Sequence, residues 1–207
     1  MEDKLSICCV LRSGGDFGWE YADKLYSNIN KYVTREFEFI IFTDLESFPV
    51  PDNIKVLPLK TDLRSYWSKL EIFNLKGNVL YFDLDTMIVG SLDNFITELF
   101  SLPKKDRFYM MEAFHPTREF SSGIMAWVGD YSYILNELVF YEAFLKYGKW
   151  EQDYIKDKLT EITSINDYLN IASYKHHCKD GVDSSTDIVV FHGKPRPKDI
   201  KWEICLK

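Results

Sequence analysis

The stretch NVLYFDLDTMIVGSLD, residues 78–93, places two aspartates within the most apolar part of the chain. The four residues before Asp83 are Val-Leu-Tyr-Phe, an unbroken apolar run that predicts a strand buried on both faces. Asp85 follows after one residue, and a second apolar run begins at Met87. Carboxylates are costly inside an apolar core, so they belong where the chain leaves it. The stretch therefore predicts a central strand that delivers two carboxylates to the edge of a sheet.

Strands and helices are predicted to alternate on both sides of this stretch. Strands are expected at residues 5–11, 37–43, 53–59, 78–82, 107–112, 123–128 and 186–192, and helices at residues 18–33, 65–75, 91–100 and 132–148. Ser65 and Ser91 are the expected N-caps of two helices, and Gly148 is the expected end of the last one. Such alternation predicts an α/β fold in a single domain over residues 1–207, with a mostly parallel central sheet flanked by helices. Ligands of such sheets bind beyond the carboxyl ends of the strands.

The composition indicates an ordinary globular protein that can bury a sizeable core. The 207 residues are 46% hydrophobic and 28% charged, with a net charge of −7. This acidic balance disfavours nucleic acid as a partner and weakens binding to anionic membranes. No apolar run approaches the ~18 residues of a membrane span, and none of the four cysteines belongs to a CxxC pair. We therefore expect a reduced, cytoplasmic protein without a membrane span, either complete or excised from a longer chain.

The spacing of Asp83 and Asp85 predicts a cation site. Two carboxylates within a few ångströms repel each other unless a cation neutralises them. Hard oxygen ligands suit Mg²⁺ or Mn²⁺, which keep coordination positions open for water or substrate phosphates. A diphosphate is then the natural second half of the site. The alternative is that both aspartates are only turn formers.

A second candidate segment is VVFHGKPRP, residues 189–197. His192 follows a buried strand, and a neutral imidazole is a suitable ligand for ions such as Mn²⁺. Gly193 permits close approach of the backbone to a phosphate, and Lys194 supplies a positive charge. The alternative is a strand end followed by a tail stiffened by prolines.

Taken together, these segments resemble a known family. SKLEIFNLKGNVLYFDLDTMIVGSLDNF resembles the central motif of nucleotide-sugar glycosyltransferases of the GT-A fold, nearest to family 8, the glycogenin and galactosyltransferase group. The segments FSSGIMAW (120–127), WEQDYI (150–155) and FHGKPRP (191–197) resemble its later motifs in the same order. The chain departs from the family in the shorter spacing between His192 and Lys194 and in SSG in place of NSG.

The resemblance implies a Rossmann-like GT-A domain that moves a hexose from a UDP-sugar to a hydroxyl group of a carbohydrate or glycoprotein acceptor. It implies a Mn²⁺ or Mg²⁺ ion held by Asp83, Asp85 and His192. It also implies retention of the anomeric configuration. An inverting reaction with Asp153 as general base remains the alternative.

The same resemblance implies roles for further residues. Contacts with the nucleotide sugar are expected from Leu11, Arg12, Asp44, Lys69, Asp83, Leu84, Ser122, Gly123, Gly193 and Lys194, and catalytic contacts from Gln152 and Asp153. Alternatives remain open for several of them. Lys69 can be a solvated helix residue, and Asp44 can cap a loop. Glu151 and Asp153 can be first-turn helix acids favoured by the dipole. The aromatic residues Trp127, Trp150 and Tyr154 can stack on sugars or belong to the core.

Two other functions are compatible with the sequence. A sugar-phosphate nucleotidyltransferase also uses metal-bound carboxylates, and RSGGDFG (12–18) faintly resembles its glycine-rich loop. A lectin-like domain that keeps the fold without catalysis is the second. The run of His176, His177 and Cys178 is not expected to bind zinc, because adjacent residues of a strand point to opposite faces.

Overall fold

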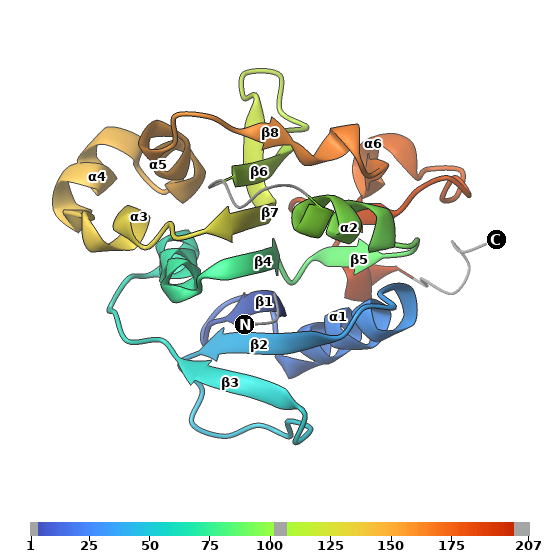
Figure 1. Cartoon of the computed structure of the whole chain (residues 1–207), viewed down its shortest axis with the longest axis horizontal. Coiled ribbons are helices and arrows are strands. Elements are labelled where there is room, and N and C mark those ends of the chain that lie inside the picture. The colour runs from blue at the N-terminus through green and yellow to red at the C-terminus, as the bar shows by residue number, and fades with distance from the viewer. Residues whose placement is uncertain (1–3, 102–106, 201–207) are drawn as a thin grey trace.

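A seven-stranded sheet with the strand order β3-β2-β1-β4-β7-β6-β8 forms the centre of the protein (Figure 1). The structure is a computed structural model that describes residues 4–101 and 107–200. The strands are β1 Leu5–Leu11, β2 Phe37–Thr43, β3 Ile54–Pro58, β4 Gly77–Phe82, β6 Arg107–Glu112, β7 Phe120–Gly129 and β8 Thr163–Ser164. Every strand is parallel to its neighbours except β7, which is antiparallel to β4 and β6. The predicted α/β fold with a mostly parallel sheet is confirmed.

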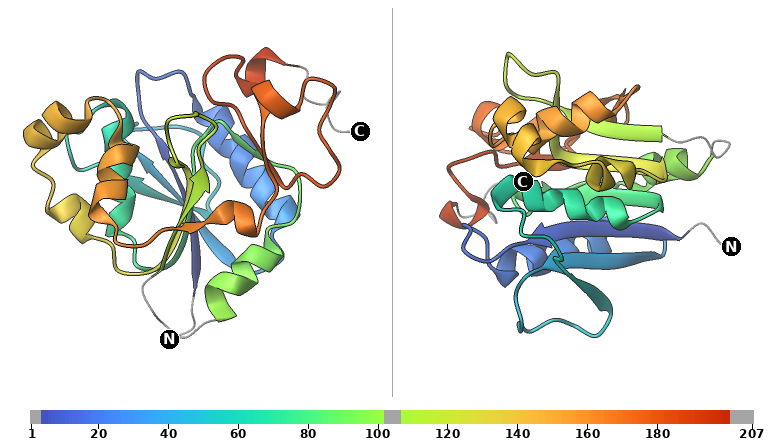
Figure 2. Two further views of the ribbon diagram at one scale, coloured as in Figure 1. Left: turned by 90° about the horizontal axis from the view of Figure 1, so that it is seen from above. Right: turned by 90° about the vertical axis from the view of Figure 1, so that its left-hand side faces the viewer.

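Helices lie on both sides of the sheet (Figure 2). The α-helices are α1 Trp19–Tyr32, α2 Asp93–Ser101, α3 Tyr133–Asn136, α4 Phe140–Tyr147, α5 Glu151–Lys158 and α6 Tyr174–His177, and the 3₁₀ helices are η1 Ser65–Asn74, η2 Ile165–Asp167 and η3 Pro197–Asp199. No helix in the described ranges is long and apolar enough to cross a bilayer.

The apolar run of β4 serves two cores at once. Leu80 and Phe82 pack into the cluster that includes α1 and α2, whereas Val79 and Tyr81 pack into the cluster that includes η1, α3 and α5. Successive residues of a strand point to opposite faces, so a strand covered on both sides must be apolar at every position. This burial explains why β4 has no alternating pattern and why its carboxyl end is firmly placed.

A second sheet brings the chain's late residues to the end of β4. It contains β5 Thr86–Ile88, β10 Ile188–Val190 and β9 Ile171–Ser173, with β10 in the middle. β10 is antiparallel to β5, and the amide of Phe191 donates a hydrogen bond of 2.9 Å to the carbonyl of Asp85. Because β5 directly follows the two aspartates, the tail after β10 lies beside them.

Helix η1 is anchored by a buried acid. The carboxylate of Glu71 accepts hydrogen bonds from the amides of Lys60 and Thr61, at 2.7 and 2.8 Å, and from the Thr61 hydroxyl at 2.6 Å. These bonds satisfy a carboxylate that would otherwise be costly to bury. They hold η1 against the preceding loop, and η1 carries Lys69.

The helices at residues 65–75 and 132–148 differ from the prediction. The first is a 3₁₀ helix whose N-cap position is Arg64, so Ser65 is not the N-cap, and Ser65 instead has a positive φ of 54°. The second is split into α3 and α4, because the backbone is extended at Val139, the N-cap position of α4, with φ −95° and ψ 91°. Gly148 does end α4, where its amide bonds to the carbonyl of Phe144.

Smaller differences concern element boundaries. β7 begins at Phe120, earlier than predicted, and its pairing with β6 is interrupted by a bulge. The last predicted strand, residues 186–192, is reduced to β10 and belongs to the smaller sheet. Ser91 accepts a hydrogen bond from the amide of Asp93, the first residue of α2, as expected of a residue that starts a helix.

Candidate functional site

A cavity of about 1180 Å³ opens at the carboxyl ends of β1 and β4. Its walls come from the loop after β1, the start of η1, the turn between β4 and β5, β7, the start of α5, and the segment after β10. This is the position at which parallel α/β sheets bind their ligands. The cavity therefore lies where the central strand was predicted to deliver its carboxylates.

Most of the predicted site residues line this cavity. They are Arg12, Lys69, Asp83, Leu84, Asp85, Gly123, Gln152, His192 and Gly193. Five predicted residues are not among its lining residues: Leu11, Asp44, Ser122, Asp153 and Lys194. Three of these five contact lining residues. Asp44 accepts two hydrogen bonds of 2.7 Å from Ser13, Ser122 bonds to Lys69, and Asp153 lies 3.5 Å from Arg118.

The two aspartates are in a turn as well as in the cavity. The Asp83 amide donates to the carbonyl of Gly123 at 2.8 Å, which continues the pairing of β4 with β7. The Asp83 carbonyl accepts from the amide of Thr86 at 3.1 Å, which closes the turn into β5. Asp83 and Asp85 can therefore form a turn and line the cavity at the same time.

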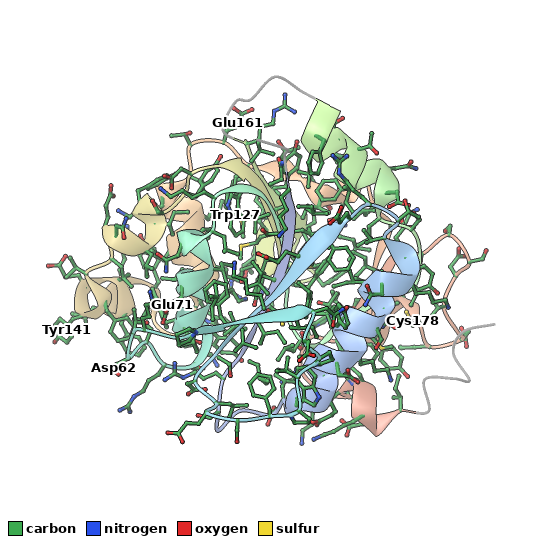
Figure 3. All side chains as sticks on the ribbon, turned by 60° about the horizontal axis from the view of Figure 1, so that its bottom comes forward. Asp62, Glu71, Trp127, Tyr141, Glu161 and Cys178 are labelled. Atoms are coloured by element: carbon green, nitrogen blue, oxygen red, sulfur yellow. The ribbon has the colours of Figure 1, made fainter. Side chains whose placement is uncertain are left out.

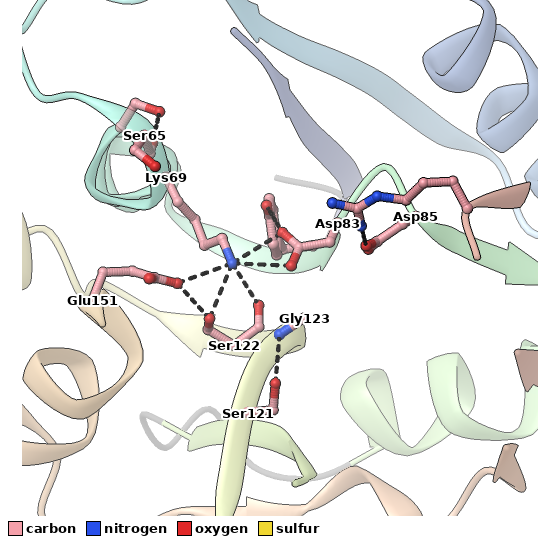
Figure 4. A network of polar contacts seen from close by, with 11 residues as sticks. Ser65, Lys69, Asp83, Asp85, Ser121, Ser122, Gly123 and Glu151 are labelled. Carbon is pink, nitrogen blue, oxygen red and sulfur yellow. Dashed lines mark hydrogen bonds and ion pairs between the residues drawn. The ribbon is translucent and has the colours of Figure 1, made fainter. Parts of the chain in front are cut away.

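Lys69 is the centre of a buried polar network (Figure 4). Its ammonium nitrogen lies 2.9 Å from Asp83 Oδ1 and 3.1 Å from Glu151 Oε1. It also donates to the hydroxyl and carbonyl oxygens of Ser122, at 3.0 and 3.2 Å. The Ser122 hydroxyl in turn donates to Glu151 at 2.6 Å. This network ties η1, β4, β7 and α5 together at the floor of the cavity.

The network keeps Lys69 charged in spite of its burial. Burial disfavours the ammonium form, but the nearby carboxylates of Asp83 and Glu151 outweigh it and raise the pKa of Lys69 above its ordinary value. The Tyr81 hydroxyl donates a short hydrogen bond to Asp83, and burial together with that carboxylate raises the pKa of Tyr81. Asp83 is thus held in place by an ammonium and a phenol.

Asp85 has a different cationic partner. Its Oδ2 atom lies 2.6 Å from a guanidinium nitrogen of Arg196, which comes from the segment after β10. Burial and the nearby Asp83 carboxylate raise the pKa of Asp85 to about 7, although Arg196 and Lys69 act in the opposite direction. Sequence reasoning overlooked Arg196, because nothing local links an arginine between two prolines to a distant aspartate.

His192 lies against aromatic and polar neighbours. Its Nε2 atom shares a hydrogen bond of 2.6 Å with the Ser173 hydroxyl. Its ring is stacked on Phe114 and on His176, with ring centroids 5.5 Å apart in both pairs. Burial, with Lys175 and the two other histidines nearby, lowers the pKa of His192 and favours the neutral imidazole.

The three predicted metal ligands do not meet as a metal site. Asp83, Asp85 and His192 line one cavity, but no group of three or more His, Cys, Asp or Glu among residues 4–101 and 107–200 is placed to hold an ion. Each of the three has another partner: an ammonium, a guanidinium and a hydroxyl. In this arrangement they do not fit a three-ligand metal site.

The run at residues 176–178 has a different structure from the one assumed. His176 and His177 belong to the short helix α6 and not to a strand, so the argument from opposite strand faces was wrong. His176 lines the cavity, His177 accepts a hydrogen bond from the Ser173 amide, and Cys178 is buried in the cluster around Phe191.

An aromatic pair lies at the cavity wall. Tyr66 and Trp150 are 48% and 37% exposed, and their rings are stacked with centroids 6.1 Å apart. The guanidinium of Arg118 lies 4.5 Å from the Trp150 ring centroid. Trp127, in contrast, lies deep within the molecule (Figure 3), as does Tyr154. Of the three aromatic residues considered from the sequence, only Trp150 can reach a ligand.

Glu151 was interpreted from the sequence only as a possible first-turn acid of a helix. It does lie in the first turn of α5, yet it is only 3% exposed and is an ion-pair partner of Lys69. The apolar residues on either side of Glu151, which are Trp before it and Tyr and Ile within the following turn, indicate only weakly that this glutamate is buried. The identity of its partner could not be inferred locally.

Comparison with known proteins gives structural matches at low sequence identity. No protein-family model and no curated protein matches the chain. The glycosyltransferase GlyE of Streptococcus pneumoniae TIGR4 superposes with a TM-score of 0.66 at 10% identity, over 99% of this chain and 62% of GlyE. The bifunctional glycosyltransferase WbbM, in its apo form, superposes with a TM-score of 0.61 at 10% identity, over 95% of this chain and 47% of WbbM.

The galactosyltransferase LgtC, in complex with donor and acceptor sugar analogs, superposes with a TM-score of 0.52 at 11% identity, over 93% of this chain and 88% of LgtC. The chain thus spans most of LgtC, less than two thirds of GlyE and about half of WbbM. These superpositions, together with the sheet topology, show that the chain has the fold of the GT-A glycosyltransferases.

Proposed function

We propose that this protein transfers a hexose from a UDP-sugar to a hydroxyl group of a carbohydrate or glycoprotein acceptor. The observation that carries the proposal is a single cavity, in a GT-A fold, that gathers Lys69, Asp83, Asp85 and Gln152 at the carboxyl end of β4. The complex of LgtC with donor and acceptor sugar analogs supports the same use of the fold.

Two arginines support a diphosphate as part of the ligand. Arg12 and Arg196 both line the cavity, and each has a buried side-chain nitrogen without a hydrogen-bond partner, Nη1 and Nε respectively. Buried donors in native proteins are normally satisfied, so these two nitrogens are candidate donors to a bound anion. Phosphate oxygens accept bonds from guanidinium groups especially well. These two arginines, with Lys69 nearby, would stabilise the negative charge of the departing UDP.

The proposed contacts of the donor sugar are Gln152 and Gly123, which line the same cavity as Asp83. Retention of configuration is the proposed outcome. The leaving diphosphate can then accept the proton of the acceptor hydroxyl, and no side-chain base is required. The inverting alternative would use Asp153, but this carboxylate faces Arg118 and does not line the cavity. Product analysis by NMR decides between the two, because the anomeric proton coupling differs between α and β products.

The proposed acceptor site is the aromatic pair Tyr66 and Trp150. Exposed aromatic faces pack well against the apolar faces of pyranose rings, and the nearby Arg118 supplies a hydrogen-bond donor. Mn²⁺ or Mg²⁺ remains the proposed cofactor on the chemistry of the two carboxylates. The three predicted metal ligands do not form a metal site in this structure. The proposed stabilisation of the departing UDP therefore relies only on positively charged side chains of the protein.

UDP is expected to raise the melting temperature of the protein. A ligand at about 100 times its Kd stabilises a folded protein by about 2.7 kcal/mol, which is roughly 5–10 °C for a chain of this size. Arg12→Ala should weaken UDP binding about tenfold or more, because it removes a charged hydrogen-bond donor. The measurement is a thermal-shift titration with UDP, GDP and TDP, followed by calorimetry of the nucleotide that binds.

Arg35→Ala is the matched control, because the Arg35 guanidinium lies on Phe100 and outside the cavity. It should leave UDP binding unchanged. If no nucleoside diphosphate shifts the melting temperature, or if Arg12→Ala binds UDP as tightly as the wild type, the proposed donor is wrong. Release of pyrophosphate from UTP and a sugar phosphate would instead favour a nucleotidyltransferase.

A further inference from the structure

Two pairs of arginines line the cavity, and they come from different segments. Arg12 and Arg196 belong to the loop after β1 and to the segment after β10, and both are proposed ligands of the donor diphosphate. Arg64 is the N-cap residue of η1, and Arg118 lies in the loop between β6 and β7. The second pair, Arg64 and Arg118, therefore needs an explanation other than the donor diphosphate.

The two pairs lie in different parts of the cavity. Arg118 is beside Trp150, the N-cap residue of α5, with its guanidinium 4.5 Å from the centroid of the indole ring. The segment after β10 begins beside α6, where His192 stacks on His176. Figure 1 shows α5 on the left of the molecule and α6 on the right. The cavity of about 1180 Å³ is larger than most small-molecule sites, so it has room for an acceptor beside a nucleotide sugar.

The charge of Arg64 and Arg118 is not balanced within the cavity. The aspartates that line the cavity are paired with Lys69 and Arg196. The carboxylate near Arg118 belongs to Asp153, which lies 3.5 Å away and does not line the cavity. Arg64 is exposed and forms no ion pair within residues 4–101 and 107–200. Because the chain as a whole has a net charge of −7, this positive charge is a local feature that indicates an anionic ligand.

The second pair of arginines adjoins the aromatic pair of the proposed acceptor site. The rings of Tyr66 and Trp150 are stacked with centroids 6.1 Å apart, and both side chains are partly exposed. Arg64 is two residues before Tyr66 in the chain. The Arg118 guanidinium and the Lys149 ammonium lie 4.5 and 4.7 Å from the Trp150 ring centroid. Attraction to the ring holds these two cations near it, so a ligand on the aromatic pair meets positive charge beside it.

We propose that the acceptor is a carbohydrate with an anionic group, a carboxylate or a phosphate. Its ring packs on the aromatic pair, and Arg64 and Arg118 bind the anionic group. This inference rests on the proposed function, which assigns the acceptor to Tyr66 and Trp150. A guanidinium binds two oxygens of a carboxylate or phosphate through parallel hydrogen bonds. A neutral sugar offers no such partner, so the two arginines determine the specificity for the acceptor.

The expected preference for an anionic acceptor is about tenfold. An ion pair at a partly exposed site changes affinity about threefold, and two such arginines together give about tenfold. Salt screens exposed ion pairs, so the preference should decrease when the salt concentration is raised from ~0.05 to ~0.5 M. Stacking on the aromatic pair is common to anionic and neutral sugars and does not contribute to the preference.

The test is an NMR titration of the whole chain, saturated with UDP, with simple glycosides. The anionic probes are methyl β-D-glucuronide and methyl β-D-glucoside 6-phosphate, and the neutral probe is methyl β-D-glucoside. The corresponding galacto isomers are titrated in the same way. UDP occupies the proposed diphosphate site and so keeps the phosphate probe from Arg12 and Arg196. The wild type should bind at least one anionic probe about tenfold more tightly than its neutral counterpart.

Substitution of the second pair of arginines should remove the preference. Arg64→Gln and Arg118→Gln should each reduce it about threefold, and the double variant should abolish it. Both positions are at least partly exposed and glutamine is polar, so the variants are expected to fold, which circular dichroism checks. Arg35→Ala removes one positive charge outside the cavity and should leave the preference unchanged. Arg12→Ala, at a UDP concentration that still saturates it, should also keep the preference.

Each outcome decides the proposal. A preference for an anionic probe that disappears in the double variant supports it, and the two anionic probes show whether the group is a carboxylate or a phosphate. Equal binding of anionic and neutral probes, a preference that survives in the folded double variant, or no binding of any probe would overturn it. An equal loss in Arg35→Ala would show a general effect of charge and overturn it as well.

UDP binding is measured separately from glycoside binding. If UDP binds and the preference for anionic probes is absent, only this inference fails. If UDP does not bind, the proposed function itself is contradicted. The two failures are therefore distinguishable.

Discussion

Replacement of Lys69 by methionine is expected to lower the free energy of unfolding by about 3–5 kcal/mol, the largest loss that we predict for one side chain. The Lys69 ammonium, 6% exposed, neutralises the buried Glu151, 3% exposed, and the partly exposed Asp83, 33% exposed. Its removal leaves two carboxylates close together without a cation, and the Ser122 hydroxyl and carbonyl lose their donor as well. Urea denaturation followed by circular dichroism measures the loss.

The matched control is Lys76→Met, which removes another lysine paired with an aspartate. Lys76 lies 2.6 Å from Asp130, but its side chain is 63% exposed, so we expect a loss below about 1 kcal/mol. The double variant Lys69→Met with Glu151→Gln should recover part of the stability, because one of the two unpaired charges is gone. A single Lys69→Met variant within about 1 kcal/mol of the wild type would contradict the assignment of this network as a buried ion pair.

The second large effect is a dependence of stability on pH that originates at Asp85. Its ordinary pKa of 3.8 is raised in the folded protein to about 7, chiefly by burial and by the Asp83 carboxylate. Between these two values the folded state binds more protons than the unfolded state. The stability that the protonated carboxyl provides is therefore lost as the pH rises from about 4 to about 7, by about 1 kcal/mol per pH unit.

Asp85→Asn should abolish this loss, because asparagine mimics the protonated carboxyl and does not titrate. The measurement is the free energy of unfolding at several pH values from 4.5 to 8, for the wild type and the variant. Asp130→Asn is the control. Hydrogen bonds from Lys76 and Ser132 lower the pKa of Asp130, so it stays ionised throughout this range and its removal leaves the slope intact. Equal slopes in the wild type and Asp85→Asn would exclude Asp85 as the origin.

The central strand was predictable because its signal is local. Residues 79–82 are apolar at each position, and β4 is indeed covered on both faces. The place of Asp83 and Asp85 followed from the same run, since a strand this apolar has to end before a charged pair. The prediction was wrong at residues 132–148, because no glycine or proline marks the break between α3 and α4 at Val139. The spacing of apolar residues along the sequence also could not distinguish the 3₁₀ helix η1 from an α-helix.

The partners of the site residues were beyond a local pattern. Arg196 and Asp85 are 111 residues apart, and only the pairing of β10 with β5 brings them together. Glu151 and Lys69 meet because α5 and η1 pack on the same face of the sheet. The sequence predicted one shared divalent ion for Asp83 and Asp85, whereas the structure gives each carboxylate a cation of its own.

The amino-acid sequence by itself thus determined most strands of the central sheet, the doubly buried strand β4 and the delivery of two carboxylates to its end. It could do so because hydrophobic periodicity and the cost of burying charge act over a few neighbouring residues. Only the tertiary structure decided which cation faces which carboxylate and which aromatic residues reach the cavity. Charges interact through space, and their distances depend on strand pairing and helix packing between segments that are remote along the chain.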